Sequence, residues 1–209
     1  TQAEADAASL MADNGNYFRG GDMHYVDQNG DHRIDSKDRV ALGSAAPDFF
    51  GGFYTQFKYK GFALGAEFSY SKGNMAYNAV RNQLEGMNTL GNQSIAVLNR
   101  WSLDGQVTNM PRVQHNDPYR STSFSERWLE DASYLRMKSV TLSYSFDKTV
   151  LNFFRSGTLY VSGENLLTAT KYLGLDPEFS YSYGETSQGL DYAKMVQPKS
   201  VKFGVNLKF

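Results

Sequence analysis

The sequence predicts an all-β protein that forms a membrane-spanning antiparallel β-barrel segment with long extracellular loops. Three observations lead to this fold class. Five segments alternate between apolar and polar residues, their connections alternate between short and long, and aromatic residues make up 14% of the 209-residue chain. Transmembrane barrels combine strands that have one lipid-facing and one water-facing side, short periplasmic turns, long extracellular loops and aromatic girdles at both interfaces.

The composition excludes several other classes of protein. The chain is 41% hydrophobic and its mean hydropathy is -0.50, and no run of about 18 apolar residues is present that would span a bilayer as a helix. The formal net charge of -1 argues against a nucleic-acid-binding protein, which would carry a basic patch. Because the chain has no cysteine, a disulfide framework and a thiolate metal site are excluded. Soluble domains and a β-barrel remain.

The first two alternating segments, 51–59 and 62–70, predict a hairpin closed by the tight turn Lys60-Gly61. In the second arm, apolar and aromatic residues occupy one face and small or polar residues the other. The first set is Phe62, Leu64, Ala66, Phe68 and Tyr70; the second set is Ala63, Gly65, Glu67 and Ser69.

The third segment, 133–146, alternates cleanly only in its second half. Leu135 and Met137 have the opposite parity to Val140, whereas Arg136 and Lys138 share the parity of Val140. Two interpretations fit this slip. Either a β-bulge lies near position 139, or the two cations sit above the apolar band of the membrane.

The fourth and fifth segments, 157–166 and 201–209, complete the set. The last nine residues, VKFGVNLKF, show the fullest alternation: the apolar face carries Val201, Phe203, Val205, Leu207 and Phe209. Nine residues match the 9–11 residues of a tilted transmembrane strand. A soluble sandwich strand facing a core is the alternative for the same pattern.

The connections orient the strands. Short links join the first to the second and the third to the fourth segment, whereas the long stretches 72–132 and 167–199 join the others. By barrel rules, Phe209 is expected on the periplasmic side and residues 1–50 outside. Within the first long stretch, helical turns are predicted at 75–84 and 93–101.

Five strands cannot close a bacterial barrel, because single-chain barrels have an even number of strands and open sheet edges do not persist in hydrocarbon. We therefore predict that residues 51–209 form the C-terminal strands and loops of a larger barrel. The missing strands would come from another polypeptide or from an upstream part. Residues 1–50 would form an extracellular loop.

The motif DQNGDHRIDSKD at 27–38 resembles a calcium loop of the EF-hand or dockerin type. Oxygen-bearing side chains at positions one, three, five, nine and twelve, and the backbone carbonyl at position seven, would supply the ligands. Two positions depart from the pattern: His32 replaces the usual glycine at position six, and an aspartate replaces glutamate at position twelve. A polar surface turn is the alternative. The candidate metal ligands, with Ca²⁺ in a structural role, are Asp27, Asn29, Asp31, Arg33, Asp35 and Asp38.

The sequence gives little support to catalysis. The three histidines, His24, His32 and His115, are scattered, so we expect surface residues rather than a zinc or triad site. Glu126, Glu130 and Asp131 form a charged lead-in to the third segment and are not expected to act as an acid/base pair. We predict no catalytic residue and no enzyme activity.

Four aromatic residues of the last long loop are candidates for contact with a ligand or a lid: Phe179, Tyr181, Tyr183 and Tyr192. They could stack on a sugar or grip a peptide. They could equally pack the loop against its neighbours.

Several segments in order carry a family resemblance. The stretches GDMHYVDQNGDHRID, YKGFALGAEF, SERWLEDASYLRMKSVTLSYSF, LYVSGENLLTATKYLGLDPE and KFGVNLKF, with AEADA, DRVALG and VLNRWS, follow one another with matching gaps. Together they resemble the C-terminal part of the SusC/RagA family of TonB-dependent outer-membrane transporters, of the Bacteroidetes type. The resemblance covers nearly the whole chain.

The resemblance implies a 22-stranded barrel in the cell outer membrane. A plug domain and a TonB box would lie upstream, and a SusD-like surface lipoprotein would form a lid over the extracellular opening. Oligosaccharides or peptides would be imported with energy relayed through the TonB complex. A different class of function remains open, a secreted calcium-stabilised β-sandwich that binds glycans.

Overall fold

The structure, a computed structural model, describes residues 1–147, 155–179 and 188–209. The chain forms two compact units. Unit 1 comprises Thr1–Gly43 and Tyr77–Leu129, and unit 2 comprises Ser44–Ala76 and Glu130–Phe209. Across the described ranges, no helix is both long and apolar enough to cross a membrane.

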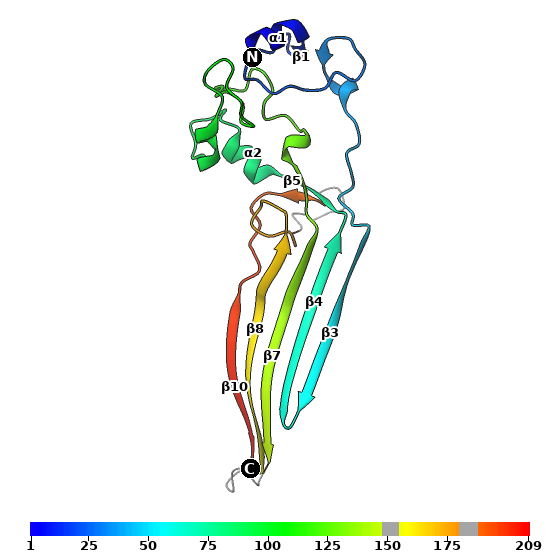
Figure 1. Cartoon of the computed structure of the whole chain (residues 1–209), viewed down its shortest axis with the longest axis vertical. Helices are drawn as coiled ribbons and strands as arrows, with labels where there is room; N and C mark the ends of the chain where they lie inside the picture. The colour runs from blue at the N-terminus through cyan, green and yellow to red at the C-terminus, as the bar shows by residue number, and fades with distance from the viewer. Residues whose placement is uncertain (148–154, 180–187) are drawn as a thin grey trace. The chain divides into compact units, whose positions relative to one another are not determined.

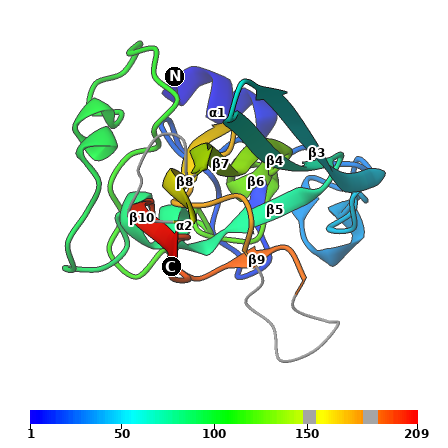
Figure 2. The ribbon, with the colours of Figure 1, turned by 90° about the horizontal axis from the view of Figure 1, so that it is seen from below.

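Unit 2 is built on a five-stranded antiparallel sheet whose order is β10-β8-β7-β4-β3. Figure 1 shows the strands side by side, and Figure 2 shows the same order along the strands. All five predicted strands are confirmed, with ends that differ by up to four residues. Their bounds are β3 Phe49–Tyr59, β4 Phe62–Lys72, β7 Tyr134–Asp147, β8 Ser156–Thr170 and β10 Ser200–Lys208.

The predicted hairpin joins β3 and β4, with Tyr59 paired to Phe62. Both turn residues adopt positive φ, 44° at Lys60 and 86° at Gly61. Two-residue turns with this geometry match the right-handed twist of the strands that they join. A Cβ atom on Gly61 would lie 2.7 Å from the carbonyl oxygen of Ser145, so the turn needs glycine for space as well as for its backbone angle.

A β-bulge in β7 explains the slip in the third segment. Ser139 pairs with Glu67, but the next pair along the sheet is Met137 with Phe68, so Lys138 is the extra residue on β7. The register between β7 and β8 shifts at the same place. Because each shift reverses the side-chain alternation, Met137 shares a face with Phe68 and Val140. The first of the two interpretations is therefore confirmed.

A second sheet in the order β6-β5-β9 contains the strands β5 (Met75–Asn78), β6 (Leu129–Asp131) and β9 (Leu190–Asp191). The predicted helical turn at 75–84 is wrong in its first part, because residues 75–78 alternate in burial as a strand. Helix α2 (Ala79–Glu85) begins only after Asn78, whose side chain accepts a hydrogen bond from the Arg81 N–H at 2.9 Å. A small core of unit 2 consists of Ala76, Ala132 and Tyr172, with Phe179 packed against it.

Unit 1 contains short elements and small cores. Helix α1 (Gln2–Ala8) starts with a capping box between Thr1 and Glu4. The predicted turn at 93–101 is confirmed as the shorter 3₁₀ helix η2 (Ile95–Asn99). The remaining elements are β1 (Met11–Ala12), β2 (Arg33–Ile34), η1 (Ser36–Asp38) and η3 (Glu126–Trp128). Buried residues form two clusters, one of Leu10, Ala12 and Phe18, the other of Met87, Val97 and Met110.

Candidate functional site

One face of the five-stranded sheet, here called the apolar face, is continuous across all strands. Register and alternation bring together Phe57, Leu64, Leu142, Val161 and Phe203 in one row. All of these side chains except the half-buried Val161 are exposed, and Phe203 is 81% exposed. A contiguous apolar surface of this size marks a site that contacts lipid or another partner.

Side-chain size varies along the apolar face. The middle row contains the small residues Thr55, Ala66, Val140, Gly163 and Val201. Aromatic rings gather on either side of it: the Phe53 and Phe68 rings stack with centroids 4.8 Å apart, and the Phe62 and Tyr144 rings lie 4.6 Å apart. Membrane barrels place aromatic girdles at both ends of their apolar band in this way.

The opposite face, here called the polar face, carries hydroxyl and charged groups from neighbouring strands. The Thr141 hydroxyl donates to the Ser162 hydroxyl at 2.9 Å. At the β8–β10 pair, the Glu164 carboxylate accepts from the Ser200 hydroxyl at 2.8 Å and from the Lys202 ammonium at 2.5 Å. A sheet with one apolar and one hydrated face suits a barrel wall between lipid and an aqueous interior.

Ion pairs tie the segment after β8 to β7. Arg136, only 2% exposed, donates to the Asp176 carboxylate. Lys138 donates to both oxygens of Glu178 at 2.7 Å. Burial raises the pKa of Asp176, but hydrogen bonds from the Gln197 N–H, from Arg136 and from the Glu178 N–H outweigh that effect and hold the pKa below its usual value. The bulge thus lets Arg136 and Lys138 reach the segment after β8, while the apolar residues of β7 stay on the other face of the sheet.

Sequence reasoning missed this role of Arg136 and Lys138. The available signal was their shared parity with each other, opposite to Leu135 and Met137. Their partners, Asp176 and Glu178, lie 40 positions further on and have the same spacing of two residues. Matching pairs of opposite charge at equal spacing could have predicted two adjacent contacts between a strand and a loop.

The candidate aromatic residues of the last loop occupy different surroundings. Phe179 packs on the Tyr172 ring with centroids 5.5 Å apart, and the Tyr172 hydroxyl donates to the Asp191 carboxylate at 2.6 Å. Burial, followed by the Asp191 contact, raises the pKa of Tyr172. Tyr192 is half exposed. Tyr181 and Tyr183 lie outside the described residues.

The candidate calcium loop folds around its first and last carboxylates. Asp27 accepts from the backbone N–H groups of Gly30 and His32, each at 2.8 Å. Asp38 accepts from the Gln28 N–H at 2.9 Å and from the Asp35 N–H at 2.7 Å. These four bonds close the twelve-residue segment into one compact loop.

The other candidate ligands of this loop also engage their own backbone. Asn29 and Asp31 are linked by hydrogen bonds of 2.9 Å, and Asp31 accepts from the Arg33 N–H at 2.9 Å. Asp35 accepts from the Lys37 N–H at 2.8 Å. Within the described part of the chain, no three histidine, aspartate or glutamate side chains are gathered as a ready metal cluster. Calcium binding therefore stays a prediction.

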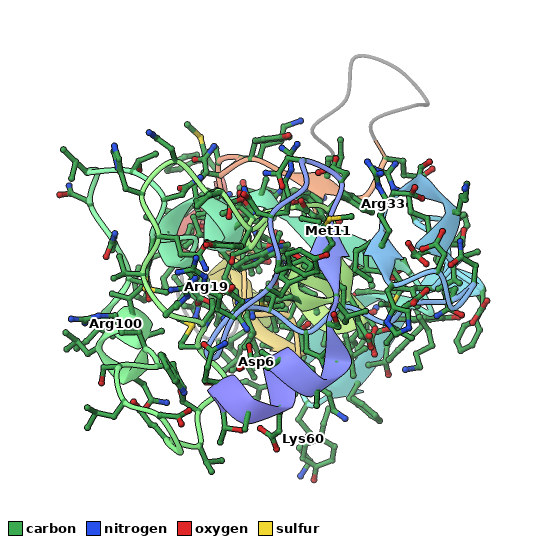
Figure 3. All side chains as sticks on the ribbon, turned by 90° about the horizontal axis from the view of Figure 1, so that it is seen from above. Asp6, Met11, Arg19, Arg33, Lys60 and Arg100 are labelled. Atoms are coloured by element: carbon green, nitrogen blue, oxygen red, sulfur yellow. The ribbon has the colours of Figure 1, made fainter. Side chains whose placement is uncertain are left out.

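Position six of the loop has the backbone conformation of a glycine position although a histidine occupies it. His32 has a φ of 60°, the left-handed conformation for which glycine is usual. Its ring Nδ1 lies 3.2 Å from the Ala8 carbonyl oxygen. The following residue, Arg33, pairs with Met11 between β2 and β1, and both are labelled in Figure 3. The sharp turn of a calcium loop is thus present without the glycine.

The residues considered for catalysis have structural surroundings. His24, His32 and His115 are all exposed. Glu130 accepts from the Leu173 N–H at 2.9 Å, and Asp131 accepts from the N–H and the hydroxyl of Ser133. The Ser133 contacts, with Lys72 and Lys171 nearby, lower the pKa of Asp131 in spite of partial burial. These contacts hold the segments just before β7 and just after β8.

Comparisons with known proteins show consistent similarities. No protein-family model matches the chain. It is 32% identical to TonB-dependent receptor P3 and 30% identical to TonB-dependent receptor P26 of Formosa agariphila, over 91% and 90% of the chain. It is 26% identical to TonB-dependent receptor SusC of Bacteroides thetaiotaomicron over 88% of the chain. It covers 19%, 20% and 17% of these relatives respectively, so it spans about a fifth of their length.

Solved structures agree with the sequence relatives. The structure of the RagAB peptide transporter matches 84% of the chain with 27% identity and a TM-score of 0.71, and the chain covers 19% of that structure's chain. The RagAB peptide importer in the open-open state matches 88% of the chain with 28% identity and a TM-score of 0.67, with 20% of its own chain covered. The two-faced sheet therefore has counterparts in solved transporters.

Proposed function

The chain belongs to the SusC/RagA family of TonB-dependent receptors, and we propose that it forms part of the wall and the loops of an outer-membrane barrel that imports large nutrients. The observation that carries this proposal is the continuous apolar face of five antiparallel strands, backed by an equally continuous polar face. Lipid would contact the first face, and the aqueous interior of the barrel the second.

The open edges of the sheet support a larger barrel. In the described structure, β3 and β10 each pair with one neighbour only. Backbone groups left unpaired in hydrocarbon cost several kcal/mol each. We propose that further strands of the same receptor pair with both edges, that its plug fills the interior, and that TonB acts through that upstream part.

The orientation follows from the connections. The turn between β3 and β4 lies at the same end of the sheet as Phe209 (Figure 1). Short turns are typical of the periplasmic side of outer-membrane barrels. We place Phe209 there, with residues 1–50, 72–132 and 167–199 outside the cell as the domain organisation predicts.

The partner and substrate belong to the same proposal. A SusD-like surface lipoprotein would cover the extracellular opening, and oligosaccharides or peptides would be captured between it and the loops. The RagAB structures are those of a peptide importer, which supports peptides as one of the two proposed substrate classes. Phe179, Tyr181, Tyr183 and Tyr192 stay the proposed ligand or lid contacts. Among the described residues, Phe179 packs on Tyr172 in the segment that Asp176 and Glu178 tie to β7.

Detergent extraction of membranes tests the proposed function. Unheated and heated samples are compared on gels, and all polypeptides that migrate together are identified by mass spectrometry. A compact, heat-modifiable species that contains barrel, plug and a lipoprotein is expected. A water-soluble species that binds a glycan by itself would instead support the alternative, the secreted calcium-stabilised sandwich.

We also propose that the loop at 27–38 binds Ca²⁺ in a structural role. Its support is the left-handed backbone at His32 and the oxygen-rich donor set at the expected positions. Asp27, Asn29, Asp31, Asp35 and Asp38 would supply side-chain oxygens, and Arg33 its backbone carbonyl. The ion would stiffen the loop and perform no chemistry.

A further inference from the structure

A groove of about 530 Å³ lies at the ends of β4, β7 and β8 that are away from Phe209. Its lining includes the apolar-face residues Tyr70, Leu135 and Ala169 and the two lysines Lys72 and Lys171. All of these residues belong to unit 2. The groove therefore combines an apolar surface with the two lysine ammonium groups.

The strand register explains this combination. Tyr70 pairs with Leu135 and Leu135 with Ala169, so the three form one row across β4, β7 and β8. Side chains return to the same face every second residue, which places Lys72 one row further out on β4, whereas Lys171 directly follows the last residue of β8. The groove thus spans the level at which the apolar band ends and polar residues begin.

The charges at the rim leave a net positive site. Asp131 is the acidic residue in the lining, and one of its oxygens is occupied by Ser133. Its other oxygen lies 3.7 Å from the Lys72 ammonium, and both side chains are about half exposed. Ion pairs of this kind are weak and screened, so an anion could replace Asp131 as the partner of Lys72.

We propose that this groove binds one phosphorylated membrane lipid. The phosphate would lie between Lys72 and Lys171, and an acyl chain would follow Tyr70, Leu135 and Ala169. Lysine is a common phosphate ligand, and basic residues at the membrane surface attract anionic headgroups. The inference rests on the proposed membrane-spanning function, because only a sheet in a bilayer meets such lipids at this level.

Lipid binding to the full-length protein tests the proposal. The protein is purified in detergent, stripped of lipid and titrated with dipalmitoyl phosphatidic acid, with dipalmitoylglycerol or with inorganic phosphate, and bound lipid is counted by native mass spectrometry. Phosphatidic acid should bind in preference to the uncharged lipid, and phosphate alone should not displace it. The double variant Lys72→Gln, Lys171→Gln should bind phosphatidic acid about tenfold more weakly.

Matched variants separate the groove from general surface charge. The double variant Lys58→Gln, Lys60→Gln removes the same charge near the hairpin turn and should bind like the wild type. Asp131→Asn removes the competing anion and should bind at least as tightly as the wild type.

Three results would overturn the proposal: equal binding of dipalmitoylglycerol, displacement by phosphate alone, or unchanged binding by the Lys72, Lys171 variant. If the protein is a heat-modifiable membrane protein and gives any of these results, only the lipid proposal is contradicted. If the protein is water-soluble, the proposed function is contradicted as well.

Discussion

Arg136 on β7 and Asp176 in the segment after β8 form an ion pair in which the arginine is almost fully buried. The pair lies beside a second one, between Lys138 and Glu178. Together they join the polar side of β7 to the last long loop. The β-bulge at Lys138 makes this arrangement possible, since it restores the apolar alternation on the opposite face.

Removing one partner of the buried pair should loosen the loop. Arg136→Met leaves the Asp176 carboxylate without its cation, and losing one member of a buried pair costs about 3–5 kcal/mol. We expect faster proteolysis within 171–199 and weaker association with the proposed SusD-like lipoprotein, measured by limited digestion and pull-down.

The double variant Arg136→Met, Asp176→Asn is the control for that experiment. It removes both charges and keeps an amide oxygen that can accept from the Gln197 or Glu178 N–H, so much of the loop protection should return. Equal protection of Arg136→Met and the wild type would contradict a structural role for the pair.

Acid should weaken the same attachment. The folded-state pKa of Asp176 is lowered, so its contribution to stability is complete above the ordinary aspartate pKa of about 3.9 and is lost as pH falls through the lower folded value. Hydrogen exchange of residues 188–199 should therefore stay slow, after correction for intrinsic rates, from neutral pH down to about pH 4, and rise below it. In Asp176→Asn, the pH-dependent step should disappear; a step that persists would assign the titration to another group.

The two faces of β7 should respond differently to a charge. Leu142 lies on the apolar face and Ser143 on the polar face. Arginine on the lipid side near the membrane midplane costs about 2–4 kcal/mol, whereas a position facing water accepts it. Leu142→Arg should reduce the heat-modifiable, membrane-inserted fraction several-fold, and Ser143→Arg should not. Similar losses for both variants would contradict the assignment of one face to lipid and the other to water.

Calcium should stabilise the loop at 27–38. We expect the melting temperature of the protein to rise with Ca²⁺ relative to a chelator, and the shift to vanish in Asp27→Asn, which removes one anionic donor. Asp104→Asn, outside the loop, is the control. Identical melting curves with calcium and with chelator would identify the loop as a polar turn held by its own hydrogen bonds.

Much of the sheet could be predicted because alternation is a local property of the chain. In β10 and in the β3–β4 hairpin, apolar and polar residues alternate, so the face of each side chain could be predicted from the sequence. The observed strand ends differ from the predicted ones by only a few positions. The bulge was visible as a change of parity, although the sequence left two interpretations. Pairing was needed to decide between them, since the partner of Met137 is a residue 69 positions away.

The errors and omissions have a shared cause. The sequence predicts a helical turn at 75–84, but pairing with the distant strands β6 and β9 makes residues 75–78 the strand β5, and the Asn78 cap lets the helix begin only at Ala79. The contacts of Arg136 and Lys138 and the groove beside Lys72 also depend on segments far apart in sequence. Local pattern carries no information on such contacts unless charges or spacings match.

The contact between the apolar face and lipid is tested most directly by fluorescence quenching. The 209-residue chain has no cysteine, so once any cysteine of the upstream part is replaced, Leu142→Cys and Ser143→Cys can each carry a single environment-sensitive dye in protein reconstituted into bilayers. Lipids brominated on their acyl chains should quench the dye at 142 strongly and the dye at 143 little, while a water-soluble quencher should show the reverse. Equal quenching at both positions by the brominated lipid, or stronger quenching at 143, would contradict the membrane-wall assignment.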